Sequence, residues 1–342
     1  MRLLMLGGTG LISVGILKSL GIRRQQEEID VVAFNRGTTP AKDNDPLPDF
    51  VREVHGDRND VAAMLGAFEG ETFDVVVDMI AFTPEHAQAT ADLARQVKAK
   101  QLLFCSTVCT YGIDIPPGVV VDETFEQNPI SKYGKDKVAC ERLLEEAAAK
   151  GDFALTIVRP SCTYGEGGPL IDQLEFNPPT WARVREGKPV VLAGDGLNLW
   201  NATHRDDVGK LFAHAAGREV TFGKAYNATT ERVFTWRDFY REAAAHFDKP
   251  ALVVFLPRDA IVAVDEKRFG LLKEITGYHG AYTSALAKRD VPEFTCDVDF
   301  ASGASRAIAH LEKADKLKAA HDATYDKLVD MAKSIGVEPI EA

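Results

Sequence analysis

Tyr133 and Lys137 stand four residues apart in a stretch with helical spacing. On a helix, side chains at positions i and i+4 share one face, so the spacing predicts that the lysine ammonium lies beside the phenol. A neighbouring cation favours the phenolate and lowers the pKa of the tyrosine, which can then accept the proton of a substrate hydroxyl. Thr107 follows an earlier apolar run and is expected to hydrogen-bond the same substrate oxygen. Thr107, Tyr133 and Lys137 are therefore the predicted catalytic group.

The chain opens with an apolar run that ends in Gly7-Gly8-Thr9-Gly10, and a helical pattern follows from Leu11. A strand, a glycine turn and a helix in this order direct backbone N–H groups and the positive end of the helix toward a pyrophosphate. Ser13 takes the third small position of the pattern and still allows close helix packing. We expect a nicotinamide dinucleotide here, with Lys137 on its ribose. The predicted cofactor contacts are Gly7, Thr9, Gly10, Leu11, Ile12, Asn35, Arg36, Asp57, Ala81, Tyr133, Lys137 and Pro160.

Asn35 and Arg36 end the second predicted strand, where a site selective for NAD usually offers a carboxylate to the ribose hydroxyls. Asn35 removes the carboxylate that would repel a 2′-phosphate, and Arg36 supplies a guanidinium that can bind one. These two residues predict NADP rather than NAD. The alternatives are that Arg36 stacks on the adenine or is a solvated loop residue. Asp57 is expected to accept from the adenine amino group.

Short apolar runs alternate with helical patterns in the first half of the chain, which is typical of strand-helix-strand units and a parallel sheet. The predicted fold is α/β, a Rossmann-type doubly wound parallel sheet with a smaller, discontinuous C-terminal substrate lobe. Residues 1–165, with about 205–230, are assigned to the dinucleotide-binding domain, and 166–204 with 231–342 to the lobe. Pro40 to Pro48 is expected to be an exposed loop. The predicted strands are Leu3–Leu6, Val31–Phe34, Val51–His55, Phe73–Asp78, Leu102–Ser106 and Ala154–Arg159, and the predicted helices are Leu11–Leu20, Asp60–Phe68, Pro84–Val97 and Ser131–Ala149.

Composition narrows the class of protein. A chain of 342 residues with 45% hydrophobic residues can build a substantial core, and its formal charge of -11 disfavours binding to nucleic acid or to an anionic membrane. Glycines interrupt the first apolar run too early for a signal peptide, so a soluble cytoplasmic protein is expected. The cysteines lack metal-binding spacing, so free thiols and no metal site are predicted. They are Cys105, Cys109, Cys140, Cys162 and Cys296.

A wider set of motifs occurs in a characteristic order between Gly7 and Asp207. It comprises Gly7 to Ser13, Gly56-Asp57, Thr107 to Gly112, Tyr133 with Lys137, Arg159-Pro160, Tyr164-Gly165, Gly194 to Gly196, His204 and Asp207. In these motifs the chain resembles the extended short-chain dehydrogenase/reductase superfamily, in particular its NAD-dependent epimerase/dehydratase group. Gly-Gly-Thr-Gly followed by Asn35-Arg36-Gly37 is most similar to the atypical branch that includes plant chloroplast stem-loop RNA-binding proteins and bacterial sugar epimerase-like proteins.

The chain departs from this family in positions that concern the substrate. Val108 and Cys109 replace the acidic pair of family dehydratases, so dehydration is disfavoured. Nucleotide-sugar members place an Asn where this chain has Cys162, and an Arg for the diphosphate where it has Trp200. Loss of the guanidinium removes a charge-assisted clamp. The resemblance implies a carbohydrate-like substrate, contacted by Cys109, Cys162, Trp200 and His204, and these departures favour one without a nucleotide diphosphate unless Arg183, Arg205 or Arg289 takes over the clamp.

These observations predict an NAD(P)-dependent sugar epimerase or oxidoreductase that acts on a secondary alcohol by hydride transfer, with Tyr133 as acid/base. One alternative is a redox sensor that binds the cofactor without turnover, and another is an RNA-binding protein on the same scaffold. The acidic charge balance disfavours RNA, and a sensor has no need of the base. Alanine-rich helices at 84–97 and 131–149 are expected to pair across a two-fold axis and form a homodimer.

Overall fold

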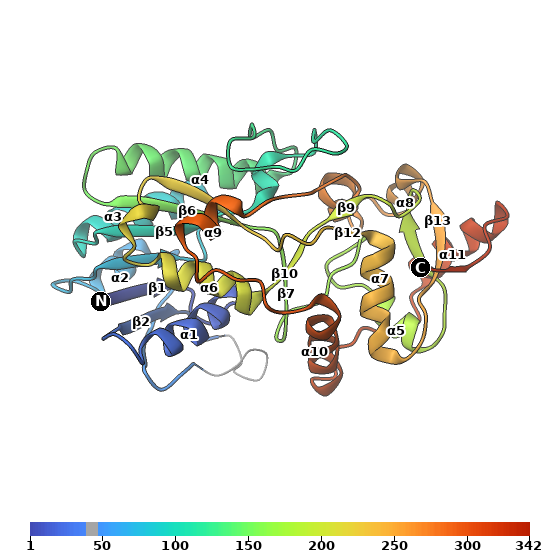
Figure 1. Ribbon diagram of the computed structural model, residues 1–342, viewed down its shortest axis with the longest axis horizontal. Helices are drawn as coiled ribbons and strands as arrows, with labels where there is room; N and C mark the ends of the chain where they lie inside the picture. The colour runs from blue at the N-terminus through green and yellow to red at the C-terminus, as the bar shows by residue number, and fades with distance from the viewer. Residues whose placement is uncertain (39–46) are drawn as a thin grey trace.

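A seven-stranded sheet forms one end of the computed structural model, which describes residues 1–38 and 47–342 (Figure 1). Most of the loop predicted at Pro40 to Pro48 lies outside the described residues. Every pairing between neighbouring strands of the sheet is parallel. The strand order is β11 (Lys224–Ala228), β6 (Ala154–Pro160), β5 (Gln101–Cys105), β4 (Val75–Asp78), β1 (Arg2–Leu6), β2 (Asp30–Asn35) and β3 (Val51–His55).

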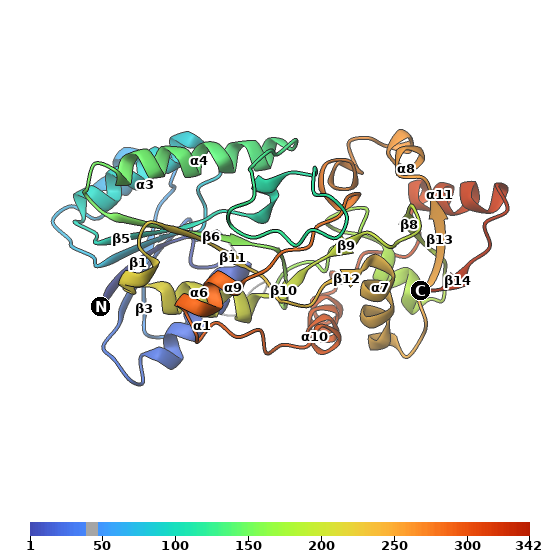
Figure 2. The ribbon, with the colours of Figure 1, turned by 45° about the horizontal axis from the view of Figure 1, so that its top comes forward.

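Helices cover both faces of this sheet because its central strands are apolar on both sides. In β1, Leu4 and Leu6 belong to one buried cluster, whereas Leu3 and Met5 belong to another. The first cluster is covered by α2 (Val61–Gly66), α3 (Pro84–Gln96) and α4 (Lys132–Ala148), and the second by α1 (Leu11–Arg23), α6 (Arg205–Ala215) and α9 (Ala285–Asp290), as Figure 2 shows. Strands buried on two faces need apolar residues at successive positions. The predicted doubly wound α/β fold is confirmed.

Helices α1 and α6 touch backbone to backbone. A Cβ atom on Gly15 would lie 2.2 Å from the carbonyl oxygen of Arg205, and a Cβ on Gly209 would lie 2.2 Å from the carbonyl carbon of Gly15. Only glycine allows so close an approach at these two positions. The helix that begins at the glycine turn is therefore fixed against a helix that lies almost two hundred residues further along the chain.

A second core lies at the other end of the molecule (Figure 1). It is built around a three-stranded sheet of β8 (Val190–Ala193), β13 (Leu252–Leu256) and β14 (Ile340–Glu341). Two short pairs, β7 (Cys162–Tyr164) with β10 (Ala202–His204) and β9 (Leu199–Trp200) with β12 (Phe234–Thr235), connect it to the large sheet. The remaining elements are α5 (Thr180–Arg185), α7 (Trp236–Ala244), α8 (Arg258–Val264), α10 (Phe300–Lys313), α11 (Ala323–Ser334), the short helices η2 (Val108–Tyr111), η3 (Glu219–Thr221) and η4 (Ala245–Phe247), and the π-helical turn η5 (Leu272–Thr276).

The alanines of α3 do not form a surface for a second chain. Ala87, Ala91 and Ala94 are fully buried in the core between α3 and its own sheet. The alanines of α3 therefore serve the packing within one protomer and give no support to a dimer, whereas Ala139 and Ala148 of α4 are half-buried. The homodimer itself stays a prediction. Within 1–38 and 47–342, no helix combines the length and the apolar character needed to cross a membrane.

Candidate active site

A cavity of about 410 Å³ lies where the carboxyl ends of β1, β4, β5 and β6 meet the C-terminal lobe. In doubly wound sheets this edge, near the point where the strand order reverses, is where ligands bind. The lining residues from the sheet half are Gly7, Gly10, Leu11, Ile12, Ser13, Met79, Ile80, Phe82, Cys105, Ser106, Thr107, Val108, Cys109, Tyr133, Lys137, Pro160, Ser161, Cys162 and Thr163, and those from the lobe are Pro169, Ile171, Phe176, Trp200, Leu271 and Ile275.

The glycine turn has the geometry of a phosphate cradle. Gly7 has a φ of 90°, and a Cβ there would lie 2.5 Å from Cγ2 of Ile80. Ser13 donates a hydrogen bond of 2.5 Å from Oγ to the carbonyl of Gly7, which closes the turn. Gly10 is the N-cap of helix α1 and offers no side chain to cap it, and the first turn of the helix carries no acidic residue. First-turn N–H groups left uncapped in this way can bind an anion, so the turn fits the pyrophosphate of a dinucleotide.

Asn35 supports this turn from β2. Its Oδ1 accepts a 2.7 Å hydrogen bond from the backbone N–H of Gly8, and its Nδ2 is buried with no partner among the described residues. Arg36 is exposed at the end of the same strand. Asp57 is also exposed and accepts from the backbone and side-chain nitrogens of Asn59, at 2.9 and 2.8 Å. Asn35 therefore shapes the cradle, a role that the sequence reasoning missed.

A buried ion pair holds the turn that follows β4. Arg58 approaches Asp78 at 3.0 Å, and the Asp78 carboxylate also accepts from the backbone N–H groups of Ile80 and Ala81, at 2.8 and 2.9 Å. The carbonyl of Ala81 in turn accepts a 2.8 Å hydrogen bond from Nζ of Lys137. Ala81 thus contributes its backbone rather than its side chain. The pair of Arg58 and Asp78 was not predicted, because its members are twenty residues apart and match no motif.

The predicted catalytic group comes together at the cavity wall. Ser131 caps α4 by accepting from the N–H of Gly134, and the first turns of the helix present Tyr133 and Lys137 to the cavity. Lys137 is only 1% exposed, and its Nζ donates to the carbonyls of Ala81 and Cys105, the latter at 2.7 Å. Thr107 begins η2 and accepts from the N–H of Cys109 at 3.2 Å. Helix α4, the start of η2 and the carbonyls of Ala81 and Cys105 therefore hold the three side chains together at the cavity wall.

The structure contradicts the expected lowering of the Tyr133 pKa by Lys137. Burial of the phenol raises the pKa of Tyr133, and a hydrogen bond from Thr107 opposes that rise only in part. The ammonium of Lys137 is turned toward two carbonyls and lies 5.9 Å from the centroid of the Tyr133 ring. Burial also lowers the pKa of Lys137 itself. Tyr133 is 41% exposed as a whole, so burial acts on its hydroxyl end, and the direction of the shift favours the protonated phenol, the form that can donate to a carbonyl oxygen.

A buried carboxylate lies directly behind Thr107. Glu141 of α4 accepts from Nε and Nη2 of Arg159, at 3.0 and 2.6 Å, from Nε2 of Gln127 at 2.7 Å and from the hydroxyl of Ser106. Arg159 also donates to the hydroxyl of Tyr111 at 3.0 Å. The side chains of Glu141 and Arg159 are 2% and 6% exposed. This network ties α4, which carries Tyr133 and Lys137 of the predicted catalytic group, to the ends of β5 and β6.

Three of the predicted substrate residues line the cavity. These residues are Cys109, Cys162 and Trp200. The indole of Trp200 stacks on that of Trp236, with ring centroids 5.1 Å apart. Burial raises the pKa of the Cys162 thiol to about 12, which makes it an uncharged group in the wall. The apolar residues Ile171, Phe176, Leu271 and Ile275 complete the lobe side of the cavity, and no sequence motif marked them.

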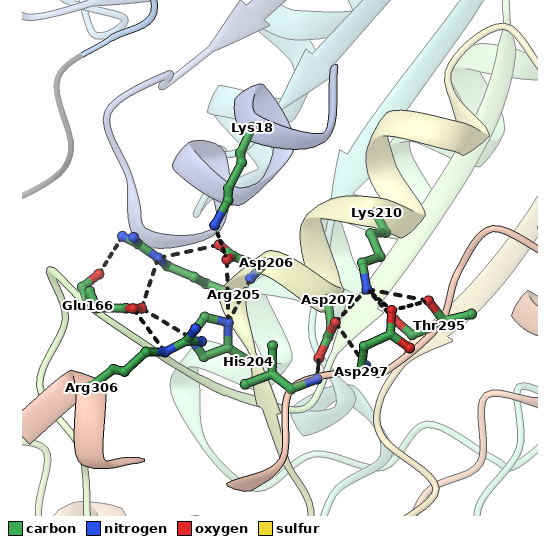
Figure 3. Close-up of polar contacts among 11 residues, drawn as sticks. Lys18, Glu166, His204, Arg205, Asp206, Asp207, Lys210, Thr295, Asp297 and Arg306 are labelled. Atoms are coloured by element: carbon green, nitrogen blue, oxygen red, sulfur yellow. Dashed lines mark hydrogen bonds and ion pairs between the residues drawn. The ribbon is translucent and has the colours of Figure 1, made fainter. Parts of the chain in front are cut away.

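His204 lies outside the set of residues that line this cavity. Its imidazole is fully buried, where Nδ1 accepts from the N–H of Asp206 at 3.2 Å and Nε2 lies 3.0 Å from a carboxylate oxygen of Glu166 (Figure 3). Arg205 and Arg306 contact the same Glu166. The hydrogen bond from His204 lowers the pKa of Glu166 to about 2. This network fixes the loop of residues 165–169, which borders the glycine turn.

No group of three His, Cys, Asp or Glu side chains among residues 1–38 and 47–342 could hold a metal ion. All five cysteines are free thiols, and burial raises the pKa of each of the three that line the cavity, Cys105, Cys109 and Cys162.

The fold, the glycine turn and the group of Thr107, Tyr133 and Lys137 together define a dinucleotide-dependent enzyme of the short-chain dehydrogenase/reductase superfamily. Comparison with protein families supports this assignment, since residues 3–228 match the NAD dependent epimerase/dehydratase family. The match covers well over half of the chain. The protein belongs to this family.

Individual relatives include a reductase and a protein named for stem-loop binding. The 2′-dehydrokanamycin reductase of Streptomyces kanamyceticus is 28% identical over 297 residues, covering 86% of this chain and 80% of that protein. The chloroplast stem-loop binding protein of 41 kDa b of Arabidopsis thaliana is 25% identical over 273 residues, covering 75% of this chain and 67% of that protein.

Solved structures share the fold at low identity. The UDP-glucose 4-epimerase of Thermotoga maritima, solved with UDP-glucose, is 18% identical with a TM-score of 0.72, covering 92% of this chain and 99% of that chain. The UDP-glucuronic acid 4-epimerase of Bacillus cereus, solved with UDP-glucuronic acid and NAD, is 17% identical with a TM-score of 0.71, covering 92% and 100%.

Proposed function

We propose that this protein is an NAD(P)-dependent oxidoreductase or epimerase that interconverts a secondary alcohol and a ketone on a carbohydrate-like molecule. The observation that carries the proposal is that Thr107, Tyr133 and Lys137 line the same cavity as Gly7 and Gly10. When bound, a nicotinamide cofactor supplies the acceptor or donor of the hydride. A sensor that only binds the cofactor, or a protein that binds RNA, does not need this group.

Each residue of the group has a distinct role in this proposal. The hydroxyl of Tyr133 exchanges a proton with the substrate oxygen, donating it in the direction of reduction and accepting it in the direction of oxidation. Thr107 hydrogen-bonds the same oxygen and so orients it toward Tyr133. Lys137, fixed by the carbonyls of Ala81 and Cys105, holds the cofactor ribose. The same hydrogen bonds set the distance between α4 and β5.

The charge of the cavity favours a substrate without a nucleotide diphosphate. Among its described lining residues, Lys137 is the one charged side chain, and two carbonyls already engage it. Three arginines could have replaced the missing clamp at Trp200. Arg183, however, pairs with Asp326, Arg289 pairs with Asp290, and Arg205 donates to the carbonyl of Glu166. A diphosphate buried without a cationic partner would carry a large desolvation cost. We therefore favour a free or simply substituted sugar, as in the relative named for 2′-dehydrokanamycin.

The choice between NAD and NADP is part of the proposal. Arg36 is exposed at the end of β2 beside the glycine turn, where its guanidinium supports NADP. The solved neighbours whose cofactor is named contain NAD. We propose NADP for this chain, on Arg36 alone, and a reducing intracellular compartment, on its five free thiols.

The experiment that tests this function is a panel of free sugars, amino sugars, sugar acids and nucleotide sugars, with the ketone form of each where it exists. Absorbance of the reduced nicotinamide measures net oxidation or reduction, and NMR detects epimers that form with no net change in cofactor. Conversion of a free sugar derivative that exceeds conversion of its nucleotide conjugate supports the proposal. Micromolar binding of a UDP-, GDP- or dTDP-sugar with its diphosphate against an arginine would refute the substrate class.

A further inference from the structure

A small recess adjoins the main cavity on the side of the C-terminal lobe. The two share four lining residues, Val108, Cys109, Trp200 and Ile275. The recess has a volume of about 20 Å³, which is room for one group the size of a water molecule. The shared lining places the recess beside a substituent of a ligand bound in the main cavity. The remaining lining residues are Gly112, Ile130, Ser131, Glu274, His279, Gly280 and Tyr282.

Glu274 brings a carboxylate to this recess. It stands on η5 and is half-buried, and no hydrogen bond or ion pair joins its carboxylate to any residue that the structure describes. Its neighbour Lys273 is engaged elsewhere, with Glu266 at 2.5 Å. Lys273 therefore acts on Glu274 only through longer-range electrostatics, and the recess contains an acidic acceptor without a direct hydrogen bond or ion pair to the described residues.

Trp200 gives a second and independent indication of a ligand. The residue is 6% exposed, and its indole N–H lies near the thiol of Cys162 without a hydrogen bond of adequate geometry to any described residue. A buried N–H group without an acceptor is rare, because it loses its hydrogen bond to water and gains none in return. Trp200 borders both the cavity and the recess, so a ligand that spans them can supply the missing acceptor.

Two further polar side chains of the recess are already engaged within the protein. Nδ1 of His279 accepts a 3.2 Å hydrogen bond from the backbone N–H of Leu199, and the hydroxyl of Ser131 accepts from the N–H of Gly134. The rings of Trp200 and Tyr282 line the same space, and aromatic faces attract ammonium groups.

We propose that this recess binds a protonated amino group of the substrate, with Glu274 as the partner of the ammonium and the Trp200 N–H donating to a neighbouring sugar oxygen. The substrate is then an amino sugar or an oligosaccharide that carries one. This inference rests on the proposed function and narrows its substrate class. Glu274 is a specificity-determining residue in this view, and it takes no part in hydride or proton transfer.

The test compares two probes that differ in charge and share one skeleton, kanamycin A and its fully N-acetylated derivative. Binding to the full-length protein saturated with reduced cofactor is measured by calorimetry, at low and at high salt. We expect kanamycin A to bind at least about tenfold more tightly than the acetylated probe, since a hydrogen bond to a charged group contributes a binding free energy of about this size. Added salt should weaken kanamycin A selectively, because ionic strength screens charge pairs.

Variants locate the effect at Glu274. Glu274→Gln should reduce the affinity for kanamycin A by about tenfold or more and leave the acetylated probe unchanged, and Glu274→Asp should restore part of the loss. Glu266→Gln is the matched control, because it removes an exposed carboxylate from the same segment. Since Glu274 has no partner to lose, the Gln variant should melt no lower than the wild type, which separates binding from folding.

Three results would overturn the inference. They are equal affinity for the two probes, no effect of Glu274→Gln on kanamycin A, and no binding of kanamycin A to protein that is saturated with cofactor. Each leaves the proposed function standing, because that function fails on different evidence. It fails where the wild-type protein binds neither NAD(H) nor NADP(H), or transfers no hydride with any member of the substrate panel.

Discussion

Glu141→Gln tests the buried network behind the catalytic group. The carboxylate accepts four hydrogen bonds from three side chains and neutralises Arg159, whose guanidinium is 6% exposed. Glutamine retains one acceptor oxygen, and its NH₂ group then faces donors of Arg159 or Gln127. The variant therefore leaves a buried cation without its counterion as well as donors without acceptors. Removing one partner of such a pair costs about 3–5 kcal/mol.

This cost converts into a melting temperature. Unfolding entropy near 60 °C is about 2.1 cal/mol/K per residue, or about 0.7 kcal/mol/K for 342 residues, so Glu141→Gln should lower the Tm by about 4–7 °C. Scanning calorimetry of the wild type and the variant measures the shift. Glu146→Gln is the matched control, because Glu146 is exposed on the same helix, and its Tm should change by less than about 1 °C.

The double variant Glu141→Gln/Arg159→Met separates the ion pair from general damage. Removal of both charges abolishes the uncompensated cation, and buried pairs replaced by apolar side chains are often neutral in stability. We expect the double variant to melt above Glu141→Gln. A Glu141→Gln Tm within about 1 °C of the wild type, or a double variant that melts lower still, would refute the reasoning.

Four further predictions concern the site and the assembly. Tyr133→Phe should reduce turnover by about 100-fold or more with nearly unchanged cofactor affinity, and steady-state kinetics at the wild-type rate would contradict its assigned role. NADP(H) should bind more tightly than NAD(H), and Arg36→Ala should erode that preference by about tenfold; calorimetry showing tighter NAD(H) binding to the wild type would recast Arg36 as an adenine-stacking residue. The Glu166 carboxylate, whose pKa falls from 4.5 to about 2 on folding, should contribute stability above pH 4.5 that is lost as the pH falls toward 2, so urea titrations of Glu166→Gln should show a smaller acid loss than the wild type. Light scattering at micromolar concentration should give twice the chain mass, and a monomer would count decisively against the homodimer.

The sheet could be predicted because its signals are local. Strands buried on two faces leave unbroken apolar runs, and the glycine turn lies within seven residues of β1. Helix ends were less predictable, since tertiary contacts set them. Helix α1 continues to Arg23, beyond the predicted end at Leu20, where the guanidinium donates to the carbonyls of Ala213 and Ala216. A contact over about 190 positions leaves no mark in the local pattern.

The residues of the candidate site also fall into two groups, those that a local pattern marks and those that only the tertiary fold brings together. Tyr133, Lys137 and Thr107 follow from a helical spacing and a strand end, so the sequence placed them on one cavity. The protonation of Tyr133 was predicted in the wrong direction, because spacing brings two side chains to one face and does not say where the ammonium points. Glu274 was also missed. It stands on a short π-helical turn with no motif, and only the tertiary fold brings it beside Trp200.

The contact between Gly15 and Gly209 has a consequence for synthesis of the chain. Helix α1 is among the first segments to leave the ribosome, yet its partner α6 ends at Ala215 and the edge strand β11 ends at Ala228. About two thirds of the protein must be translated before this face of the sheet is covered, and until then its apolar residues stay open to chaperones or to other nascent chains. An N-terminal fragment that stops after β6 would expose the same face permanently. The cofactor-binding half therefore matures late, although it is encoded first.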